Sequence, residues 1–95
     1  MHIISRKKLK EAAARHNDIE APLDVWFRIV KKASWRNLAE VRKTFANADA
    51  VDRWTVFNVK GSRYRLIAEI NYRFQRLYIR HVLTHAEYDR ERWKQ

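Results

Sequence analysis

The fold is decided by residues 54–70, which read WTVFNVKGSRYRLIAEI. The β-branched and aromatic residues that dominate 54–59 are typical of a strand. Residues 60–62 form a turn, because Gly61 can adopt the positive φ that a tight reversal requires. From residue 64 to residue 72 apolar and polar side chains alternate, which indicates a second strand. The stretch therefore predicts a β-hairpin with one face turned towards a core.

A third strand follows the hairpin. A tight reversal near residues 73–74 leads to an apolar segment over residues 77–83, which has the composition of a strand. Regular alternation along this segment places Ile79 and Leu83 on the core face and Val82 on the opposite face. Together the three strands predict an antiparallel meander, and an antiparallel sheet can leave one face to solvent.

Helical patterns precede these strands. Residues 2–4 can form a short opening strand, and Ser5 is placed to cap a helix that ends near Ala14. Pro22 suits the first turn of a second helix, in which apolar residues recur with the i, i+3, i+4, i+7 spacing of one helical face. Asn37, with a glutamate three residues later, predicts the start of a third helix.

A final helix and the overall class complete the fold prediction. Thr84 and Glu87 repeat the capping-box spacing, so a helix is expected from His85 to about Lys94. The 95 residues include one glycine and one proline, and no linker or repeat divides the chain. We therefore predict a single domain over residues 1–95 of the α+β class, an antiparallel sheet with helices packed on one face and a short C-terminal helix.

The charge balance indicates a polyanionic partner. Lys and Arg number 21 against 11 Asp and Glu, so the formal net charge is +10. A small domain with this charge attracts polyanions and binds them quickly. Nucleic acid is the expected partner, while an anionic membrane surface, an acidic protein partner and a role in solubility alone are the alternatives.

The composition also excludes several kinds of site. With no cysteine, the chain has neither a disulfide nor a thiolate metal site. The four histidines are scattered, and a single glycine cannot build a phosphate-binding or dinucleotide-binding loop. We therefore expect no metal and no cofactor. No apolar run has the length of a signal peptide or a membrane span, so we expect a cytoplasmic protein that does not contact membranes.

With metal and cofactor sites excluded, lysine, arginine, histidine and tyrosine are the side chains available for catalysis. These side chains can cleave RNA through its own 2′-hydroxyl, since one group takes the hydroxyl proton and another protonates the leaving oxygen. Cationic donors stabilise the charge that develops on the phosphate. None of these roles requires a metal, so the composition is compatible with a metal-independent ribonuclease.

Two parts of the chain resemble one protein family. Residues 54–61 and 64–67 are similar to the central hairpin of HigB-family toxins, and residues 78–89, which read YIRHVLTHAEYD, resemble that family's last strand and closing helix. The resemblance implies a RelE-like fold and the toxin of a type II toxin–antitoxin system. It further implies an endoribonuclease that cleaves messenger RNA, commonly on the ribosome, and inhibits translation and growth. A cognate antitoxin, expected to be a helix-turn-helix protein of the HigA type, completes the implied system.

The resemblance assigns four catalytic candidates. Arg65 matches the arginine that faces the scissile phosphate, a task that suits a planar guanidinium, unless it is an ordinary surface arginine. Lys60 lies near the family's first-strand lysines and could bind the phosphate, act as the base or be a simple turn residue. His85 occupies the place of a catalytic histidine or arginine and is the other candidate base, unless it is only a first-turn residue. Tyr88 could stack on a nucleobase, donate a hydrogen bond or pack in the core.

Five further cations are candidate RNA contacts. They are Arg63, Arg80, Lys7, Lys8 and Lys10. An ion pair with Glu69 is the competing interpretation at Arg80, and a solvated helix face is the competing interpretation of the lysines. Asp89 could orient a cation or favour the helix N-terminus. Trp35 and Trp93 could be exposed for contact with the antitoxin.

Two other functions fit the same basic face. A non-catalytic RNA-binding or ribosome-binding module is the main alternative, and an inactive toxin-like partner protein is the third hypothesis. All three predict RNA binding, and they differ in whether single substitutions abolish an activity. Little apolar surface is left over once the core is assigned, so we expect the free protein to be a monomer.

Overall fold

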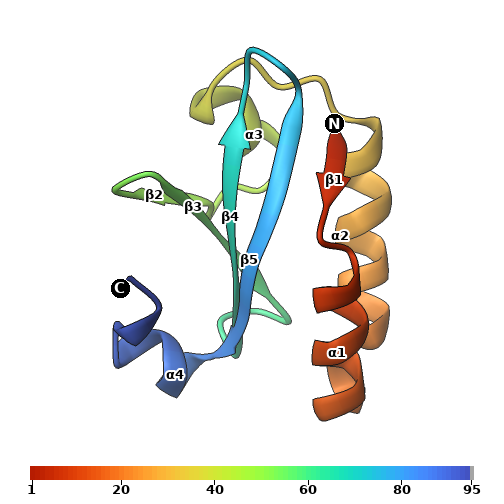
Figure 1. Ribbon diagram of the computed structural model, residues 1–95, viewed down its shortest axis with the longest axis vertical. Coiled ribbons are helices and arrows are strands. Elements are labelled where there is room, and N and C mark those ends of the chain that lie inside the picture. Colours follow the sequence, from red (N-terminus) through yellow and green to blue (C-terminus); the bar gives the residue numbers. More distant parts are fainter. Residues whose placement is uncertain (95) are drawn as a thin grey trace.

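The computed structural model describes residues 1–94, in which one five-stranded sheet is flanked by helices (Figure 1). The strands are β1 (His2–Ile4), β2 (Asp49–Val51), β3 (Trp54–Val59), β4 (Tyr64–Asn71) and β5 (Arg76–Thr84). Their order in the sheet is β1-β5-β4-β3-β2. Neighbours from β2 to β5 pair antiparallel, whereas β1 pairs parallel with β5 at the edge. The predicted meander and opening strand are confirmed, and the three-residue β2 is an addition to them.

Four helices surround the sheet. They are α1 (Lys7–Arg15), α2 (Glu20–Lys32), α3 (Leu38–Thr44) and α4 (His85–Asp89), with 3-10 turns η1 (Asn17–Ile19) and η2 (Arg92–Lys94). α1 and α2 lie side by side, and α4 lies on the opposite side of the sheet (Figure 1). This arrangement confirms the α+β class. Within residues 1–94, no helix has the length and apolar character needed to cross a membrane.

Two apolar clusters hold the sheet, one on each face. The larger cluster lies beneath the helices and includes Leu23, Trp26, Phe57, Leu66 and Ile79. The smaller cluster consists of Trp54, Val56, Ile67 and Trp93, with Leu83 and Tyr88 packed against it. Leu66 and Ile67 are both fully buried, because adjacent strand residues point to opposite faces and both faces are covered here. The C-terminal segment therefore covers part of the face that α1 and α2 leave open.

A β-bulge in β5 changes the faces of its last residues. The register shifts between Ile67 and Ala68 of β4, which leaves one extra residue, Arg80, in β5. Val82 consequently joins the helix-covered cluster, and Leu83 packs against the smaller cluster. The faces predicted for Val82 and Leu83 were wrong, because regular alternation cannot anticipate an extra residue.

The caps predicted at Asn37 and Thr84 are confirmed, and two other helix ends differ from the prediction. Asn37 caps α3, since its side chain accepts the backbone N–H of Glu40 at 3.0 Å. Ser5 does not cap α1, because its φ of 72° is left-handed and an N-cap is normally extended. The final helix was predicted to reach about residue 94, but α4 ends at Asp89, shortly before Glu91 adopts a φ of 59°.

Candidate active site

α4 begins directly after β5 with a complete capping box. The hydroxyl of Thr84 accepts the backbone N–H of Glu87 at 3.2 Å, and the Glu87 carboxylate accepts the backbone N–H of Thr84 at 2.9 Å. The hydrogen bond from the Thr84 backbone holds the pKa of Glu87 below its usual range. The backbone N–H of His85 donates to the carbonyl of Arg63 at 2.9 Å, which ties the first turn of α4 to the hairpin. His85 and Tyr88, three residues apart, therefore share a fixed helical face.

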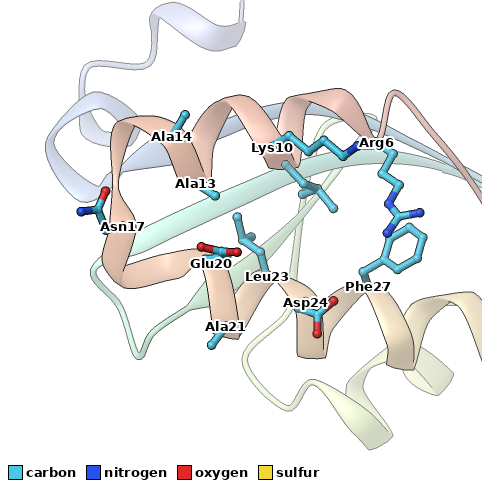
Figure 2. A pocket seen from close by; sticks show the side chains of 11 residues that line it. Arg6, Lys10, Ala13, Ala14, Asn17, Glu20, Ala21, Leu23, Asp24 and Phe27 are labelled. Atoms are coloured by element: carbon cyan, nitrogen blue, oxygen red, sulfur yellow. The ribbon is translucent and has the colours of Figure 1, made fainter.

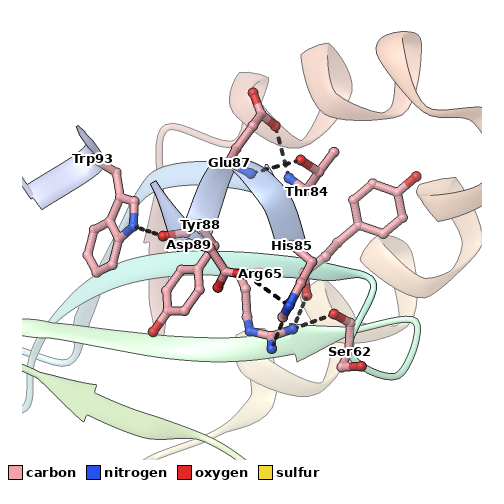
Figure 3. Close-up of polar contacts among 9 residues, drawn as sticks. Ser62, Arg65, Thr84, His85, Glu87, Tyr88, Asp89 and Trp93 are labelled. Atoms are coloured by element: carbon pink, nitrogen blue, oxygen red, sulfur yellow. Dashed lines mark hydrogen bonds and ion pairs between the residues drawn. The ribbon is translucent and has the colours of Figure 1, made fainter. Parts of the chain in front are cut away.

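Arg65 stands at the centre of the polar contacts in Figure 3. Its Nη1 donates to the carbonyls of Ser62 at 2.6 Å and Tyr64 at 3.4 Å. Its Nη2 lies 3.3 Å from Nδ1 of His85. The guanidinium carbon is 5.3 Å from the centre of the Tyr88 ring, within the range of a cation–π contact. The hairpin's own carbonyls thus fix a guanidinium beside two of the predicted catalytic residues.

His85 has a partner at each ring nitrogen. Nε2 lies 3.1 Å from Oδ2 of Asp89, one helical turn later. Because arginine can only donate, the contact with Arg65 makes Nδ1 the acceptor and assigns the ring proton to Nε2, facing the carboxylate. The side chains of His85 and Asp89 are 55% and 59% exposed. The arrangement places Nδ1 beside a fixed cation at the surface, and an anion that binds this guanidinium would lie next to a nitrogen able to act as a general base.

Tyr88 packs against Trp93, which in turn packs against Trp54. Its ring stacks on Trp93 with the ring centres 5.2 Å apart and the planes inclined by 14°. The indole N–H of Trp93 donates to the carbonyl of Tyr88 at 2.9 Å, and the indole packs edge-on against Trp54. Trp93 and Trp35 are 6% and 7% exposed, so the prediction that either could be exposed for the antitoxin was wrong. Both rings serve the packing instead.

Lys60 lies apart from this group. Its Nζ is 2.8 Å from Oδ2 of Asp18 in η1, and the hydroxyl of Tyr64 donates to Oδ1 at 3.0 Å. The hydrogen bond from Lys60 holds the pKa of Asp18 below its usual range, while burial and then the bond to Asp18 raise the pKa of Tyr64. Tyr64 packs against the helix-covered cluster, so its strand neighbour Arg65 projects from the other face. The structure does not bring Lys60 together with Arg65 and His85.

Two candidate RNA contacts lie in the sheet or in the turn beside it. Arg80 is in an ion pair, since its Nε lies 3.1 Å from Oε1 of Glu69. The same carboxylate oxygen is 3.4 Å from Nε of Arg53. The ion pair was the competing interpretation of Arg80, and the structure shows it. Arg63 is exposed in the turn that leads into β4, next to the start of α4.

The three candidate lysines lie on α1. Lys7 and Lys10 are exposed, and Lys8 is half-buried. Lys10 also lines a groove of about 880 Å³ between α1 and α2 (Figure 2). The groove combines bases from the α1 side, acids from α2 and apolar side chains from α2: Arg6, Lys10, Glu20, Asp24, Leu23 and Phe27. None of its lining residues belongs to the group around Arg65.

The structure shows two side-chain contacts that the sequence analysis did not identify. In the sequence analysis Asp89 has two possible roles, and its i+4 spacing from His85 is the signal that identifies a side-chain pair on a helix. No spacing pattern in the sequence reveals the contact of Arg53 with Glu69, because it joins the residue before β3 to a residue within β4. Among residues 1–94, no three His, Asp or Glu side chains are grouped so as to hold a metal ion.

Comparison with known proteins places the chain in a family. The family model HigB_toxin, described as the RelE-like toxic component of a toxin–antitoxin system, matches residues 19–91. The chain is 33% identical over 93 residues to the mRNA interferase HigB of Escherichia coli O6:H1, an alignment that covers 95% of this chain and 90% of that protein. It is also 33% identical over 92 residues to the mRNA interferase toxin HigB of Escherichia coli K12 and to the mRNA interferase HigB of Shigella flexneri. These matches include the strands and the helix that carry Arg65, His85 and Tyr88, and the chain belongs to the HigB family, the RelE-like toxic components of toxin–antitoxin systems.

Proposed function

We propose that this toxin is an endoribonuclease that cleaves messenger RNA and thereby inhibits translation and growth. The observation that carries the proposal is the line of contacts from Arg65 through His85 to Asp89 at an exposed surface. It provides an anion-binding group, a proton acceptor and a carboxylate that orients the acceptor. The net charge of +10 supports an RNA substrate, and the relatives' name, mRNA interferase, supports messenger RNA.

The chemistry assigns one step to each residue. The guanidinium of Arg65 binds the scissile phosphate and stabilises the charge that develops on it. When Nη2 of Arg65 turns from Nδ1 of His85 to the phosphate, the freed Nδ1 takes the proton of the adjacent 2′-hydroxyl, whose oxygen attacks the phosphorus. Asp89 accepts the hydrogen bond of Nε2–H and stabilises the imidazolium that forms. The 5′-oxygen leaves and takes a proton from the solvent to which the site is open, so that a 2′,3′-cyclic phosphate and a 5′-hydroxyl result.

His85 is preferred over Lys60 as the base. The ammonium of Lys60 is engaged by Asp18 on the helix side of the sheet, whereas His85 contacts Arg65 directly. Tyr88 complements the site as a platform for a nucleobase next to the cleaved bond, because its ring is held by Trp93 and touches the guanidinium. Arg63, at the neighbouring turn, is positioned to bind an adjacent phosphate.

Controlled expression of three forms tests the proposal. The wild type, His85→Ala and the matched control His2→Ala are induced, and growth and the 5′ ends of messenger RNA are followed together. His2 is exposed on the edge strand β1 and has no part in the site. We expect the wild type and His2→Ala to stop growth and to create new 5′ ends within translated frames, and His85→Ala to do neither.

Purified protein tests the mechanism. Cleavage of a defined RNA should continue in the presence of a metal chelator, and a 2′-deoxy substitution at the cleaved position should block it, because the attacking oxygen is then missing. If folded wild-type protein binds RNA but cuts neither the free RNA nor the same message during translation, the chain is a non-catalytic RNA-binding module, and the enzymatic proposal fails.

Two partners follow from the proposed role. The basic surface fits action on messenger RNA held by the ribosome, which is tested by comparing cleavage of free RNA with cleavage of the same message during translation. An antitoxin of the helix-turn-helix HigA type is the expected inhibitor. Co-expression of the protein encoded beside the toxin should restore growth, and an inactive toxin-like protein would need no such neighbour.

A further inference from the structure

The turn between β4 and β5 presents an aromatic ring to solvent between two arginines. Phe74 is 59% exposed, more than any other large hydrophobic residue within residues 1–94. The guanidinium carbons of Arg73 and Arg76 lie 5.4 Å and 5.9 Å from the centre of its ring. Exposed rings of this kind, when grouped with cations, are typical of surfaces that bind a partner.

The turn that carries Phe74 is fixed by hydrogen bonds. The side-chain oxygen of Asn71 accepts the backbone N–H of Phe74 at 3.0 Å. The side-chain amide of Gln75 donates to the carbonyl of Trp35 at 2.7 Å and to that of Tyr72 at 2.8 Å. The turn is therefore tied to the segment before α3. A ring on such a support loses little conformational freedom when a ligand binds to it.

The charges around the ring lack acidic partners. Within residues 1–94, neither Arg73 nor Arg76 forms an ion pair, whereas Arg53 and Arg80 both contact Glu69. The two guanidinium groups are consequently available to an external anion. An aromatic face with flanking cations is the combination that binds single-stranded nucleic acid, because the nucleobase stacks on the ring and the cations bind the phosphates.

We propose that Phe74, Arg73 and Arg76 form a second RNA-binding site, which stacks an unpaired nucleobase and binds the phosphates beside it. The proposal rests on the proposed function, since it takes RNA as the ligand. Asn71 pairs with Arg76 at this end of the hairpin, and Arg65 lies six residues away along β4. At about 3.4 Å per residue, roughly 20 Å separate the two places. The second site therefore contributes to binding and not to the chemical step.

Two sources can supply the nucleobase. It belongs either to the RNA strand that is cleaved, several nucleotides from the cut, or to a ribosomal RNA that surrounds that strand. The chemistry of recognition is the same in both cases. The two sources are distinguished by whether the contact forms with a short RNA alone or only with the ribosome.

Binding is measured in a His85→Ala background, so that no RNA is cut. The probes are an unstructured RNA of about 12 nucleotides, a duplex of the same length and purified ribosomes. Phe74→Ala is compared with Phe74→Trp and with the control Val25→Ala, which removes an apolar side chain that is 50% exposed on α2. Circular dichroism establishes that each variant is folded.

We expect Phe74→Ala to weaken binding of unpaired RNA by about tenfold, within the range for loss of one stacking aromatic. Phe74→Trp and Val25→Ala should bind as the parent does, and the duplex should be insensitive to Phe74. Replacing both Arg73 and Arg76 by alanine should reduce the slope of log K against log salt by about 1.4 for a single strand. A loss with the short RNA assigns the site to the cleaved strand, and a loss with ribosomes alone assigns it to ribosomal RNA.

Unchanged binding of every probe by Phe74→Ala would overturn the proposal. So would a loss of affinity for the antitoxin with RNA binding intact, since the ring would then be a protein contact. The test is independent of catalysis, because it is read in a variant that lacks His85. In the enzyme with His85 intact, Phe74→Ala should raise KM and leave kcat unchanged. A wild type that binds RNA but cuts it neither free nor during translation would remove the proposed function and leave this binding result standing.

Discussion

The side chain of Arg65 enters the site with one nitrogen already engaged by the carbonyls of Ser62 and Tyr64. The remaining edge is presented to His85 and to solvent. Arg65→Lys keeps the charge but loses the planar fork, so it cannot satisfy the carbonyls and a phosphate together. We expect cleavage by Arg65→Lys to fall by roughly 100-fold, as for loss of a transition-state donor, measured by single-turnover cleavage of a labelled RNA. Retention of more than half of the wild-type rate would show that charge alone is sufficient.

Asp89 is expected to act only through His85. Asp89→Asn can turn its amide N–H towards Nε2, which would move the ring proton to Nδ1 and remove the base. We expect a roughly tenfold to 100-fold loss in the cleavage rate, with RNA affinity unchanged. Asp49→Asn is the matched control, because Asp49 forms an exposed ion pair with Arg42 away from the site. Equal losses in the two variants would indicate a general effect of charge and not orientation of the histidine.

Single residues of the site were predictable to different degrees. Arg65, His85 and Tyr88 were expected to act together, and the structure brings them together. The capped helix α4 fixes the positions of His85 and Tyr88, and the alternation of side chains along β4 turns Arg65 towards them. The position of Lys60 was not predictable, since it depends on its own φ of 53° and on Asp18, 42 residues away in sequence. A local pattern holds no information about such a distant partner.

At the scale of the element, the capping box of α4 determines where His85 stands. Thr84→Ala removes the side-chain acceptor of the cap and should lower the free energy of unfolding by about 1 kcal/mol. Cleavage should fall further than this loss of stability explains, because the first turn of α4 also positions His85 beside Arg65. Thr44→Ala, at the exposed end of α3, is the control. Thermal unfolding and cleavage rates measured on both variants show whether cleavage falls because His85 is misplaced or because the whole protein is less stable.

The other half of the cap makes the stability of α4 depend on pH. The folded state lowers the pKa of Glu87 from its usual 4.5, so the ionised carboxylate stabilises the fold above that pH and the contribution is lost as pH falls through the lowered pKa. Glu87→Gln lacks this titration. We expect the wild type to be the more stable of the two at pH 7 and the difference to shrink below about pH 4.5. A difference that stays constant in denaturant titrations over this range would contradict the assignment.

Elements were predicted best where their signals are local. The hairpin and the caps at Asn37 and Thr84 follow from neighbouring residues, and the structure has them. The bulge at Arg80 was missed because regular alternation cannot anticipate an extra residue. The early end of α4 was missed because it depends on how the C-terminal segment packs Trp93 against the sheet. Tertiary packing of this kind overrides a periodic pattern.

For the whole molecule, we expect a monomer when the antitoxin is absent. The exposed large hydrophobics within residues 1–94 are Val25, Ile29 and Phe74, which lie on two separate elements and do not form one broad patch. A net charge of +10 adds repulsion between copies. Sedimentation at several protein concentrations should give a single species of 11.6 kDa. A dimer that persists on dilution would show that one of these surfaces is an interface.

The α+β class was predictable from the sequence because the change from helical to strand periodicity is strong near residue 52. The coverage of both sheet faces was not, since it requires Trp93 at the C-terminal end to meet Trp54 in β3. Likewise, β1 and β2 are three residues each, too short for a distinctive pattern to reveal their partners.

The short length of β1 and β2 affects how readily the free toxin aggregates when the antitoxin is absent. Unpaired strand edges invite other chains to add to a sheet and to grow into aggregates. Here each of the two outermost strands is only three residues long, and acidic Asp49 and Asp52 lie in and beside one of them. A toxin released from its antitoxin would therefore resist self-templated precipitation and persist as a dispersed, diffusible molecule until it is inhibited again.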